Sequence, residues 1–451
     1  MNTENSASKI SFRTWTAFVI YGLIGQIAWT IENNYLNVFI YKTVTYNPDA
    51  IAVMVAASAV IATLATLFMG ALSDKLGKRK VFMAAGYIIW GITITLFGFI
   101  KKQSVAKLFP AADAVTLTVT FIVMLDCLMT YIGSTANDAA FNAWVTDVTV
   151  PSNRGRAEGL LATMPLLSML VVFGLLDGLT QKGKWIEFFL IVGAAVFASG
   201  ILGIFIIKDK PMEKKEGNYF QNIFYGFRIS TIKQNKLLYI IFATVCLLGI
   251  AQQVFMPYFI IYFEFYLHIT DYALVLGVVL IFASIISVLM GRLVDKFGKQ
   301  KFLIPSAIVY VLGMLALYIV GIAVKGNKIL IMALMALFGT LTMGAYMLEM
   351  VALNSATRDL IPKDHVGLFV GIRMIFFVMI PMVIGPLIGS NIIKNSPLTY
   401  IDEFGTLQST PTPGIFLGGA IVAVFSIIPV IFILRDMKKP GYYASKVAER
   451  N

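Results

Sequence analysis

Long apolar segments, separated by short polar ones, run through almost the whole chain. Each is about as long as the roughly 20 residues that a helix needs to cross the hydrocarbon of a bilayer. The short strands of alternating polarity that are typical of a membrane β-barrel do not appear. The pattern therefore predicts twelve membrane-spanning helices, near residues 14–41, 50–72, 81–100, 115–145, 156–179, 185–207, 237–266, 271–291, 302–323, 329–356, 366–393 and 413–434.

The loops between these spans differ in charge in a regular way. Most of the 36 Lys and Arg residues fall in alternate loops, together with the two ends of the chain. Positive loops stay in the cytoplasm, so both termini are predicted to be cytoplasmic. The longest of these loops separates six spans from six. We therefore expect an N-terminal six-helix bundle at 1–207, a cytoplasmic linker at 208–236 and a C-terminal six-helix bundle with a cytoplasmic tail at 237–451.

Composition agrees with an all-α integral membrane protein. Of the 451 residues, 58% are hydrophobic and 13% are charged, about half the charged fraction of a soluble protein. The net charge of +12 follows from the cytoplasmic loops, so no nucleic-acid partner is expected. Cys127 and Cys246 lie inside apolar segments, which predicts neither a disulfide nor a metal site. The first apolar segment lacks the features of a cleaved signal and is expected to be retained.

The chain also repeats itself. GALSDKLGKRK at 70–80 and GRLVDKFGKQK at 291–301 match at seven of eleven positions. Each lies between the second and third span of its half. A weaker match relates 141–159 to 353–371, and each of these segments lies between the fourth and fifth span of its half. The two matches predict a duplication, with two pseudo-symmetric six-helix bundles of the same topology.

The first repeated loop resembles the signature loop of the major facilitator superfamily, with Lys75 and Lys78 in place of its two usual arginines. The resemblance implies a substrate site between the halves near the midplane and a loop that latches the cytoplasmic side. An ordinary positive-inside loop would explain the Lys and Arg, but not the paired Gly and Asp. The predicted gate residues are Gly70, Asp74, Gly77, Lys78, Arg79, Gly291, Asp295 and Gly298.

The first five spans resemble more closely the glycoside–pentoside–hexuronide:cation symporters. Three short pieces carry this resemblance: YG at 21–22, MG-x-x-x-D at 69–74 and NDAAF at 137–141. It implies that Asp138 binds a sugar. The sodium-coupled members carry two carboxylates on span two, where this chain has Ala62 and Thr66. A proton is therefore the expected coupling ion, sodium is less favoured, and no cofactor or metal is expected.

Ionisable side chains inside membrane spans are costly, and are functional candidates for that reason. Asp126, Asp177 and Glu264 fall near the outer ends of their spans and are expected to be interfacial. Asp138, Glu349 and Arg373 fall in the inner halves of their spans, and we assign proton coupling to these three. Glu349 and Arg373 are expected to form an ion pair between spans ten and eleven, which is either structural or changes partners during transport.

Polar side chains on spans one and seven suggest where a substrate binds. In GQIAWTIENNYLN (25–37), Gln26, Trp29, Asn33 and Asn37 form one helical stripe, which Glu32 borders. Amides and an indole ring suit a sugar, although the same amides could hydrogen-bond between helices. In AQQVFMPYF (251–259), two glutamines precede Pro257, which can break the helix. The predicted substrate-binding residues are Gln26, Trp29, Glu32, Asn33, Asn37, Asp138, Asn142, Gln252, Gln253 and Tyr258.

These features predict a transporter and not an enzyme. The chain has no phosphate-binding GxxxxGK[ST] motif and no nucleophile–base constellation. We expect proton-coupled import of a sugar or glycoside by alternating access. Efflux of drugs or other small solutes by proton antiport and uncoupled uniport remain open. Low cysteine content and abundant Ile, Lys and Asn favour a bacterial plasma membrane, and the protein is expected to be monomeric.

Overall fold

The computed structural model describes most of the spans and the loops that connect them. The described residues are 10–149, 157, 160–161, 163–209, 228–297, 300–361, 369, 372–396, 398–401 and 407–437. By contacts they divide into two compact units, described separately below. Unit 1 comprises Met1–Thr45 and Val60–Gly217, and unit 2 comprises Tyr46–Ala59 and Asn218–Asn451.

Helices account for nearly all of the described structure, as the hydrophobic pattern predicts. The elements up to the linker are α1 (Phe12–Thr30), η1 (Ile31–Tyr35), α2 (Leu36–Thr43), α3 (Pro48–Leu76), α4 (Arg79–Phe97), α5 (Lys102–Leu108), α6 (Ala114–Gly133), η2 (Ser134–Phe141), α7 (Asn142–Val148), α9 (Met164–Val171), η3 (Val172–Leu176), α10 (Asp177–Gln181) and α11 (Trp185–Ile206). Those after it are α13 (Ile229–Gln234), α14 (Lys236–Phe255), η5 (Met256–Tyr258), α15 (Phe259–Ile261), η6 (Tyr262–Tyr266), α16 (Tyr272–Phe297), α17 (Gln300–Ala323), α18 (Lys328–Leu360), η8 (Ile375–Met379), α20 (Ile380–Lys394), β1 (Thr399–Ile401), β2 (Leu407–Ser409) and α21 (Gly414–Met437).

Eleven of the helical segments in the described residues are long and apolar enough to cross a membrane. The remaining predicted span corresponds to α16, whose apolar part Tyr272–Ile286 is shorter than the other eleven. The twelve-span prediction is therefore close to what the structure shows. One feature was not predicted: β1 and β2 pair as a short antiparallel hairpin between the last two spans.

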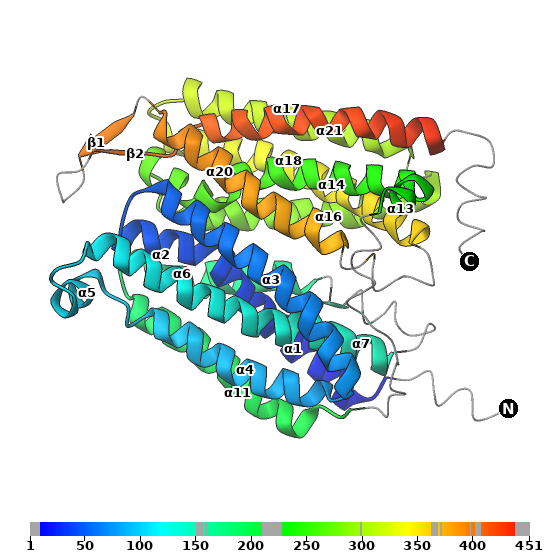
Figure 1. Ribbon diagram of the computed structural model, residues 1–451. Helices are drawn as coiled ribbons and strands as arrows, with labels where there is room; N and C mark the ends of the chain where they lie inside the picture. The colour runs from blue at the N-terminus through cyan, green and yellow to red at the C-terminus, as the bar shows by residue number, and fades with distance from the viewer. Residues whose placement is uncertain are drawn as a thin grey trace. The chain divides into compact units, whose positions relative to one another are not determined.

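The same packing pattern occurs in both units. In unit 1, α1 packs against α9 and α11, and α4 packs against α6 and α11. In unit 2, α14 packs against α20 and α21, and α17 packs against α18 and α21. These are the corresponding spans of two six-helix halves. Figure 1 shows α4 beside α11, and α17 beside α21. The duplication that the two sequence matches predict therefore recurs in the packing.

Helix α3 is the one element whose residues divide between the two units. Its N-terminal residues up to Ala59 group with unit 2, and its residues from Val60 group with unit 1. Within unit 2, Asp49 accepts hydrogen bonds from Ser390 and from Lys394 Nζ, the latter at 2.8 Å. Both side chains of this ion pair are about half exposed, so its contribution to stability is small. The predicted boundaries assign the whole of this helix to the N-terminal bundle.

Five π-helical segments interrupt the spans in the described residues: η1, η2, η3, η6 and η8. A π-helical turn holds an extra residue and redirects the side chains that follow it, and such turns are frequent at functional sites. Two of the five carry candidate carboxylates, Glu32 in η1 and Asp138 in η2. The local irregularity thus coincides with the acidic positions that the sequence singles out.

The polar loop before α6 shows how a span begins. The Asp113 carboxylate caps this helix by accepting hydrogen bonds from the backbone N–H groups of Val115 and Thr116, at 3.2 and 3.1 Å. The Thr116 hydroxyl also donates to it. These bonds stabilise the ionised carboxylate and lower the pKa of Asp113. Because Asp113 is fully exposed, this cap mainly fixes where the span starts.

Candidate functional site

In unit 1, Asp138 lies in the C-terminal half of the fourth span (Ala114–Val148), on the π-helical segment η2. Its Oδ2 accepts a hydrogen bond of 3.0 Å from the Ser134 hydroxyl. The Asn142 amide donates to the Asp138 backbone carbonyl at 3.1 Å, and Asn142 itself is exposed within the unit. Asp138 is only half-buried. One side of its carboxyl is therefore fixed by Ser134, while the side chain keeps access to its surroundings.

Beside Asp138, its neighbour Asn137 joins spans one, three and four. The Trp29 indole N–H lies 3.4 Å from Asn137 Oδ1, which makes a long hydrogen bond. The Asn137 amide donates to the Tyr87 hydroxyl at 2.6 Å, and that hydroxyl donates to the Tyr21 carbonyl at 3.0 Å. Neither Asn137 nor Tyr87 was predicted from the sequence to be a site residue. Adjacency to Asp138 was the one available signal for Asn137.

Trp29 is held by rings as well as by this hydrogen bond. It lies on the indole of Trp90 with ring centroids 5.0 Å apart. Trp90 in turn contacts the Tyr87 ring edge-on at 5.3 Å. Trp29 remains half-buried, whereas Trp90 is fully buried. Trp29 is thus supported by packed rings, and its predicted contact with a sugar ring stays a prediction.

The amide stripe on span one divides in the structure. The Asn33 amide is exposed and donates to the Trp29 carbonyl, and the fully buried Asn37 amide donates to the Asn33 carbonyl, both at 2.9 Å. Both amides therefore donate to carbonyls of their own helix. The sequence predicted that they would hydrogen-bond either to a substrate or to a neighbouring helix. Gln26 is half-buried. Of these three amides, Asn33 has the most access to its surroundings.

Glu32 reaches from span one toward span four. Its side chain is 6% exposed, and its Oε1 accepts a hydrogen bond of 2.8 Å from the Thr130 hydroxyl. Asp126, one helical turn before Thr130, is fully buried and interacts electrostatically with Glu32. Asp126 is therefore buried within its unit, and its predicted depth at the membrane interface stays a prediction. Position near the end of a span does not expose a side chain that faces the other helices of its bundle.

Two more carboxylates were expected at the interface, and one of them, Asp177, has interior contacts. Asp177 is 3% exposed and accepts hydrogen bonds from Tyr35 at 2.9 Å and from Gln181 at 2.6 Å. Its role is structural, because these donors satisfy it within the unit. Glu264 lies in the π-helical segment η6 and is half-buried.

In unit 2, the glutamines of span seven differ from each other. Gln252 is buried: its Oε1 accepts from the Tyr310 hydroxyl at 3.0 Å, and its amide lies 3.2 Å from Met343 Sδ. Gln253 is half-buried and packs against Gly385. The helix breaks after them, as Pro257 predicts, because α14 ends at Phe255 and a 3₁₀ turn follows.

Tyr258 is fully buried, and the structure gives it a packing role. Its hydroxyl lies 2.9 Å from the Pro386 carbonyl and 3.3 Å from the Pro48 carbonyl. Gly389 allows this close approach, since a Cβ there would meet the Tyr258 ring at 2.7 Å. Both the ring and the hydroxyl are thus occupied by neighbouring helices, which does not fit the predicted contact with substrate.

Glu349 and Arg373 do not form the expected ion pair. Glu349 is fully buried, and neither carboxylate oxygen has a hydrogen-bond partner among the described residues. The Arg373 guanidinium donates to Asn354 Oδ1 at 3.1 Å and lies 4.8 Å from the centre of the Phe377 ring. The two residues lie on different helices, and the sequence does not reveal how each helix is rotated about its axis.

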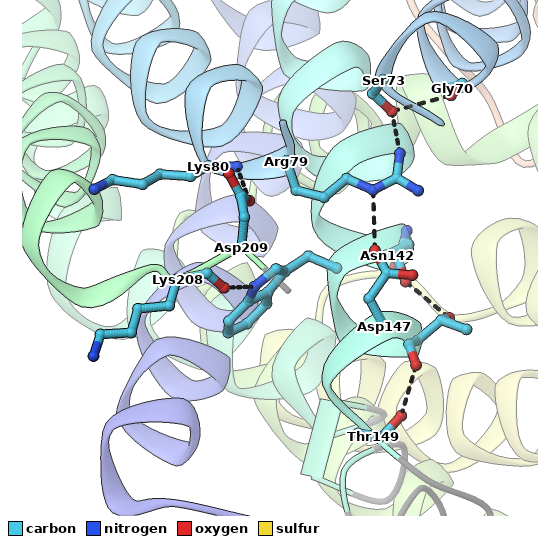
Figure 2. Close-up of polar contacts among 11 residues, drawn as sticks. Gly70, Ser73, Arg79, Lys80, Asn142, Asp147, Thr149, Lys208 and Asp209 are labelled. Atoms are coloured by element: carbon cyan, nitrogen blue, oxygen red, sulfur yellow. Dashed lines mark hydrogen bonds and ion pairs between the residues drawn. The ribbon is translucent and has the colours of Figure 1, made fainter. Parts of the chain in front are cut away.

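A polar cluster in unit 1, the Arg79 cluster, centres on Arg79, which is 3% exposed. Its Nε donates to Asp147 Oδ2 at 3.1 Å, and its Nη1 donates to the Ser73 hydroxyl. The Ser73 hydroxyl donates to the Gly70 carbonyl at 3.0 Å. Figure 2 shows Arg79 between Ser73 above and Asp147 below. Gly77 has a positive φ of 62°, which glycine adopts without strain in the tight turn that precedes α4.

Among the other predicted gate residues, Lys78 is exposed. Gly291 lies in α16, whereas Gly298 and the side chains of Asp74 and Asp295 lie outside the part of the chain whose placement is described. The structure therefore shows a polar cluster at the first copy of the repeated loop, with Arg79 at its centre. Arg79 was predicted as one gate residue among eight, but Asp147 was not predicted as its partner.

Comparisons with known proteins agree with this architecture. The family description of the Major Facilitator Superfamily matches residues 16–386. No curated protein matches the chain. A mutant of the nucleoside transporter NupG is 12% identical, with a TM-score of 0.69, over 94% of this chain and 99% of that chain.

A second structure is similar at a comparable level. It is a bacterial homologue of the human lysosomal transporter Spinster, in an inward-facing and unoccupied conformation. It is 14% identical with a TM-score of 0.59, over 98% of each chain. At such identities the two structures support the fold alone. Since the family match covers most of the chain, this protein belongs to the Major Facilitator Superfamily and is a multi-pass membrane transporter.

Proposed function

We propose that this transporter imports a sugar or glycoside together with a proton. The observation that carries the proposal is the arrangement around Asp138 in unit 1. A half-buried carboxyl lies inside a span, on a π-helical segment, next to an asparagine that contacts a half-buried tryptophan. Carboxylate and amide groups exchange hydrogen bonds with hydroxyls, and an indole covers the apolar face of a sugar ring.

The resemblance of the NDAAF segment to the glycoside–pentoside–hexuronide:cation symporters supports the same choice. In that family the matching aspartate binds sugar. Asn33 lies near Trp29 in the sequence, Asn142 lies near Asp138, and both amides are exposed. We include these two residues in the substrate site, together with Gln26, Trp29 and Asp138. Tyr258 is left out because neighbouring helices occupy its ring and hydroxyl.

Proton coupling is assigned to Asp138 and Glu349. A buried carboxyl without a hydrogen-bond partner is unstable as an anion, and gains from binding a proton. Glu349 meets this description among the described residues. Arg373 is not given a direct part in this step, because its guanidinium contacts Asn354 and Phe377. Coupling requires that the loaded site favour conformations that the half-loaded site does not.

The cellular setting is part of the proposal. The distribution of Lys and Arg supports cytoplasmic termini, and composition supports the plasma membrane of a bacterium. The proton would then move down its gradient into the cell, and the substrate would enter with it. We also propose that the protein is a monomer.

External pH tests the proposal directly. De-energised cells that express the protein would receive monosaccharides, disaccharides and nucleosides one at a time, with Asp138→Asn in parallel. We expect the medium to become more alkaline with a sugar or glycoside, and no change in the variant. Glu187→Gln is a matched control, because Glu187 is an exposed carboxylate at the start of α11.

Other outcomes would contradict parts of the proposal. Entry of labelled sugar without a pH change would indicate uniport or another coupling ion. A response to nucleosides alone would replace the substrate class. Resistance to toxic compounds, with no response to any sugar, would favour efflux by proton antiport.

A further inference from the structure

The Trp29 side chain in unit 1 is held by two neighbouring spans. Trp90 of α4 lies against its ring, with the ring centroids 5.0 Å apart. Span four comes close at Gly133, where a Cβ would meet Trp29 Cη2 at 3.1 Å and the Trp90 ring at 2.7 Å. The indole N–H reaches Asn137 Oδ1 of the same span at 3.4 Å. The indole ring therefore has packing contacts and one directional contact.

The directional contact is part of a chain of hydrogen bonds that can run in one sense only. The Tyr21 carbonyl can only accept, so the Tyr87 hydroxyl donates its single proton to it, at 3.0 Å. That hydroxyl then accepts from the Asn137 amide, at 2.6 Å. The other end of Asn137 is its carbonyl oxygen, which faces the Trp29 N–H, a group that can only donate. Both ends of the chain thus require the same orientation of the Asn137 amide.

The lengths of these bonds show which residue holds which. The 3.4 Å contact of Trp29 is longer than an ordinary N–H···O bond, so it keeps the indole in place only if Asn137 is itself fixed. Asn137 is 4% exposed and Tyr87 is fully buried. A hydrogen bond between buried groups is strong and costly to lose, because water cannot replace it. The Tyr87 hydroxyl therefore fixes Asn137, and through Asn137 it fixes Trp29.

This arrangement determines what Trp29 can offer to a ligand. Its N–H is the one polar group of the indole, and Asn137 already accepts from it. Trp29 is nevertheless only half-buried, so a ligand meets it as an apolar ring surface. Such a surface suits the C–H face of a saturated ring, and it provides no hydrogen bond that would select one hydroxyl over another.

We propose that Tyr87 and Asn137 are positioning residues for substrate recognition, which hold the Trp29 indole so that it presents only apolar ring surface to the substrate. The proposal rests on the proposed function above. Both residues are buried and act through Trp29, without touching the substrate themselves. Asn137 directly precedes Asp138 in η2, so one helical segment fixes both the aromatic and the acidic part of the site. The ligand class that this arrangement favours is a saturated ring with an apolar face and hydroxyls at its edge.

Ultraviolet resonance Raman spectroscopy of the purified full-length protein tests the held indole without any substrate. Indole bands respond to hydrogen bonding of the N–H, and subtraction of the spectrum of the same protein with Trp29→Phe isolates Trp29. We expect Tyr87→Phe, which keeps the ring and removes the hydroxyl, to shift the Trp29 band toward that of an unbonded indole. Tyr131→Phe is the matched control, because Tyr131 is exposed and its hydroxyl lies 3.2 Å from Met69 Sδ. It should leave the band unchanged.

A double-mutant cycle on uptake tests recognition, with the sugar that the alkalinisation assay identifies. Tyr87→Phe and Trp29→Phe should each weaken apparent affinity by about tenfold, the effect of losing one buried hydrogen bond, with a much smaller change in maximal rate. The combined variant should be no weaker than Trp29→Phe alone, because Tyr87 acts only through the indole N–H. Asn137→Leu should behave as Tyr87→Phe does, and Tyr131→Phe should transport normally.

Three results would overturn the proposal. An unchanged Trp29 band in folded Tyr87→Phe protein would show that the hydroxyl does not hold the indole. Affinity losses that add in the combined variant would show that Tyr87 acts independently of Trp29. A lower maximal rate with unchanged affinity would place Tyr87 and Asn137 outside recognition. Failure of every sugar in the cell assay would instead contradict the proposed function, and the Raman result would still decide whether these two residues hold Trp29.

Discussion

At the residue scale, the buried carboxyl groups are the most informative side chains. Asp177 shows the ordinary solution, in which neighbouring donors satisfy a buried carboxylate: Tyr35 and Gln181 hydrogen-bond to it. Glu349 shows the opposite, because it is fully buried and neither oxygen has a hydrogen-bond partner among the described residues. It lies beside Tyr310 and Tyr346, whose rings are 5.6 Å apart and which interact with its charge. A side chain kept in such a place costs stability, which favours a functional reason for its presence.

This cost predicts a stabilised variant. Glu349→Gln keeps the size of the side chain and removes its charge, so it should stabilise the protein by about 1 kcal/mol or more where Glu349 would ionise. The gain should increase as pH rises, because the ionised form of Glu349 becomes more populated. Thermal unfolding of purified protein across a pH series measures this difference. Glu187→Gln should show no such trend, because Glu187 is exposed. An equal pH dependence in wild type and Glu349→Gln would refute the prediction.

At the element scale, close helix approaches position the polar groups. Span one passes near span four at Gly25, where a Cβ would collide with the Asn137 amide and with the Tyr87 hydroxyl at 2.6 Å. Gly133 performs a similar role, because a Cβ there would meet the Trp90 ring at 2.7 Å. The absence of side chains at these two positions lets Trp29, Asn137 and Tyr87 meet. The π-helical turns add to this by redirecting Glu32 and Asp138.

Gly25→Ala should therefore damage the substrate site more than the fold. The added methyl group must displace Asn137 or Tyr87, with a cost of about 1–3 kcal/mol for overpacking. Transport of the identified substrate should fall, with weaker apparent affinity, in a protein that still purifies as a single species. Gly174→Ala is the matched control, because no atom lies within 4 Å of a Cβ at that position. Unchanged affinity in Gly25→Ala would separate Asn137 from substrate binding.

At the scale of the whole molecule, two similar bundles are each held together by repeated helix pairs. In unit 1 the Arg79 cluster adds polar contacts to this packing. Arg79 begins α4 and contacts Ser73 of α3 and Asp147 of α7. The Lys80 backbone N–H, next in the chain, donates to the Asp209 carboxylate at 2.8 Å. A few side chains thus connect the ends of four segments within one unit.

Arg79→Ala should weaken unit 1 as a whole. It leaves Asp147 without its cation and opens a buried volume, and removal of one partner of a buried ion pair costs about 3–5 kcal/mol. Arg79→Lys should recover only part of this loss, because an ammonium cannot reproduce the two-sided contact of a guanidinium. The thermal midpoint of the purified protein measures both effects. Lys78→Ala, at the adjacent exposed residue, should change little, and an equal loss in that control would contradict the assignment.

Much of the fold was predictable because the bilayer imposes it. A span must be long, apolar and helical, and these requirements are visible in the order of residues. The repeated loop and the second weaker match likewise predicted a duplication that recurs in the helix pairs. The surroundings of individual side chains were less predictable. Pro257 ended a helix as expected, but nothing in the pattern predicted that Tyr258 beside it is enclosed by helix packing.

The sequence by itself determined the class of the protein, the approximate number and ends of its spans, and its superfamily, because each depends on hydrophobicity or on residues close together in the chain. Tertiary structure alone decided the partners of the polar groups. It buried Asp126 beside Glu32, separated Glu349 from Arg373 and joined Arg79 to Asp147. The physical reason is that a contact between spans depends on the rotation and approach of two helices. Those are set by the packing of many side chains across each bundle.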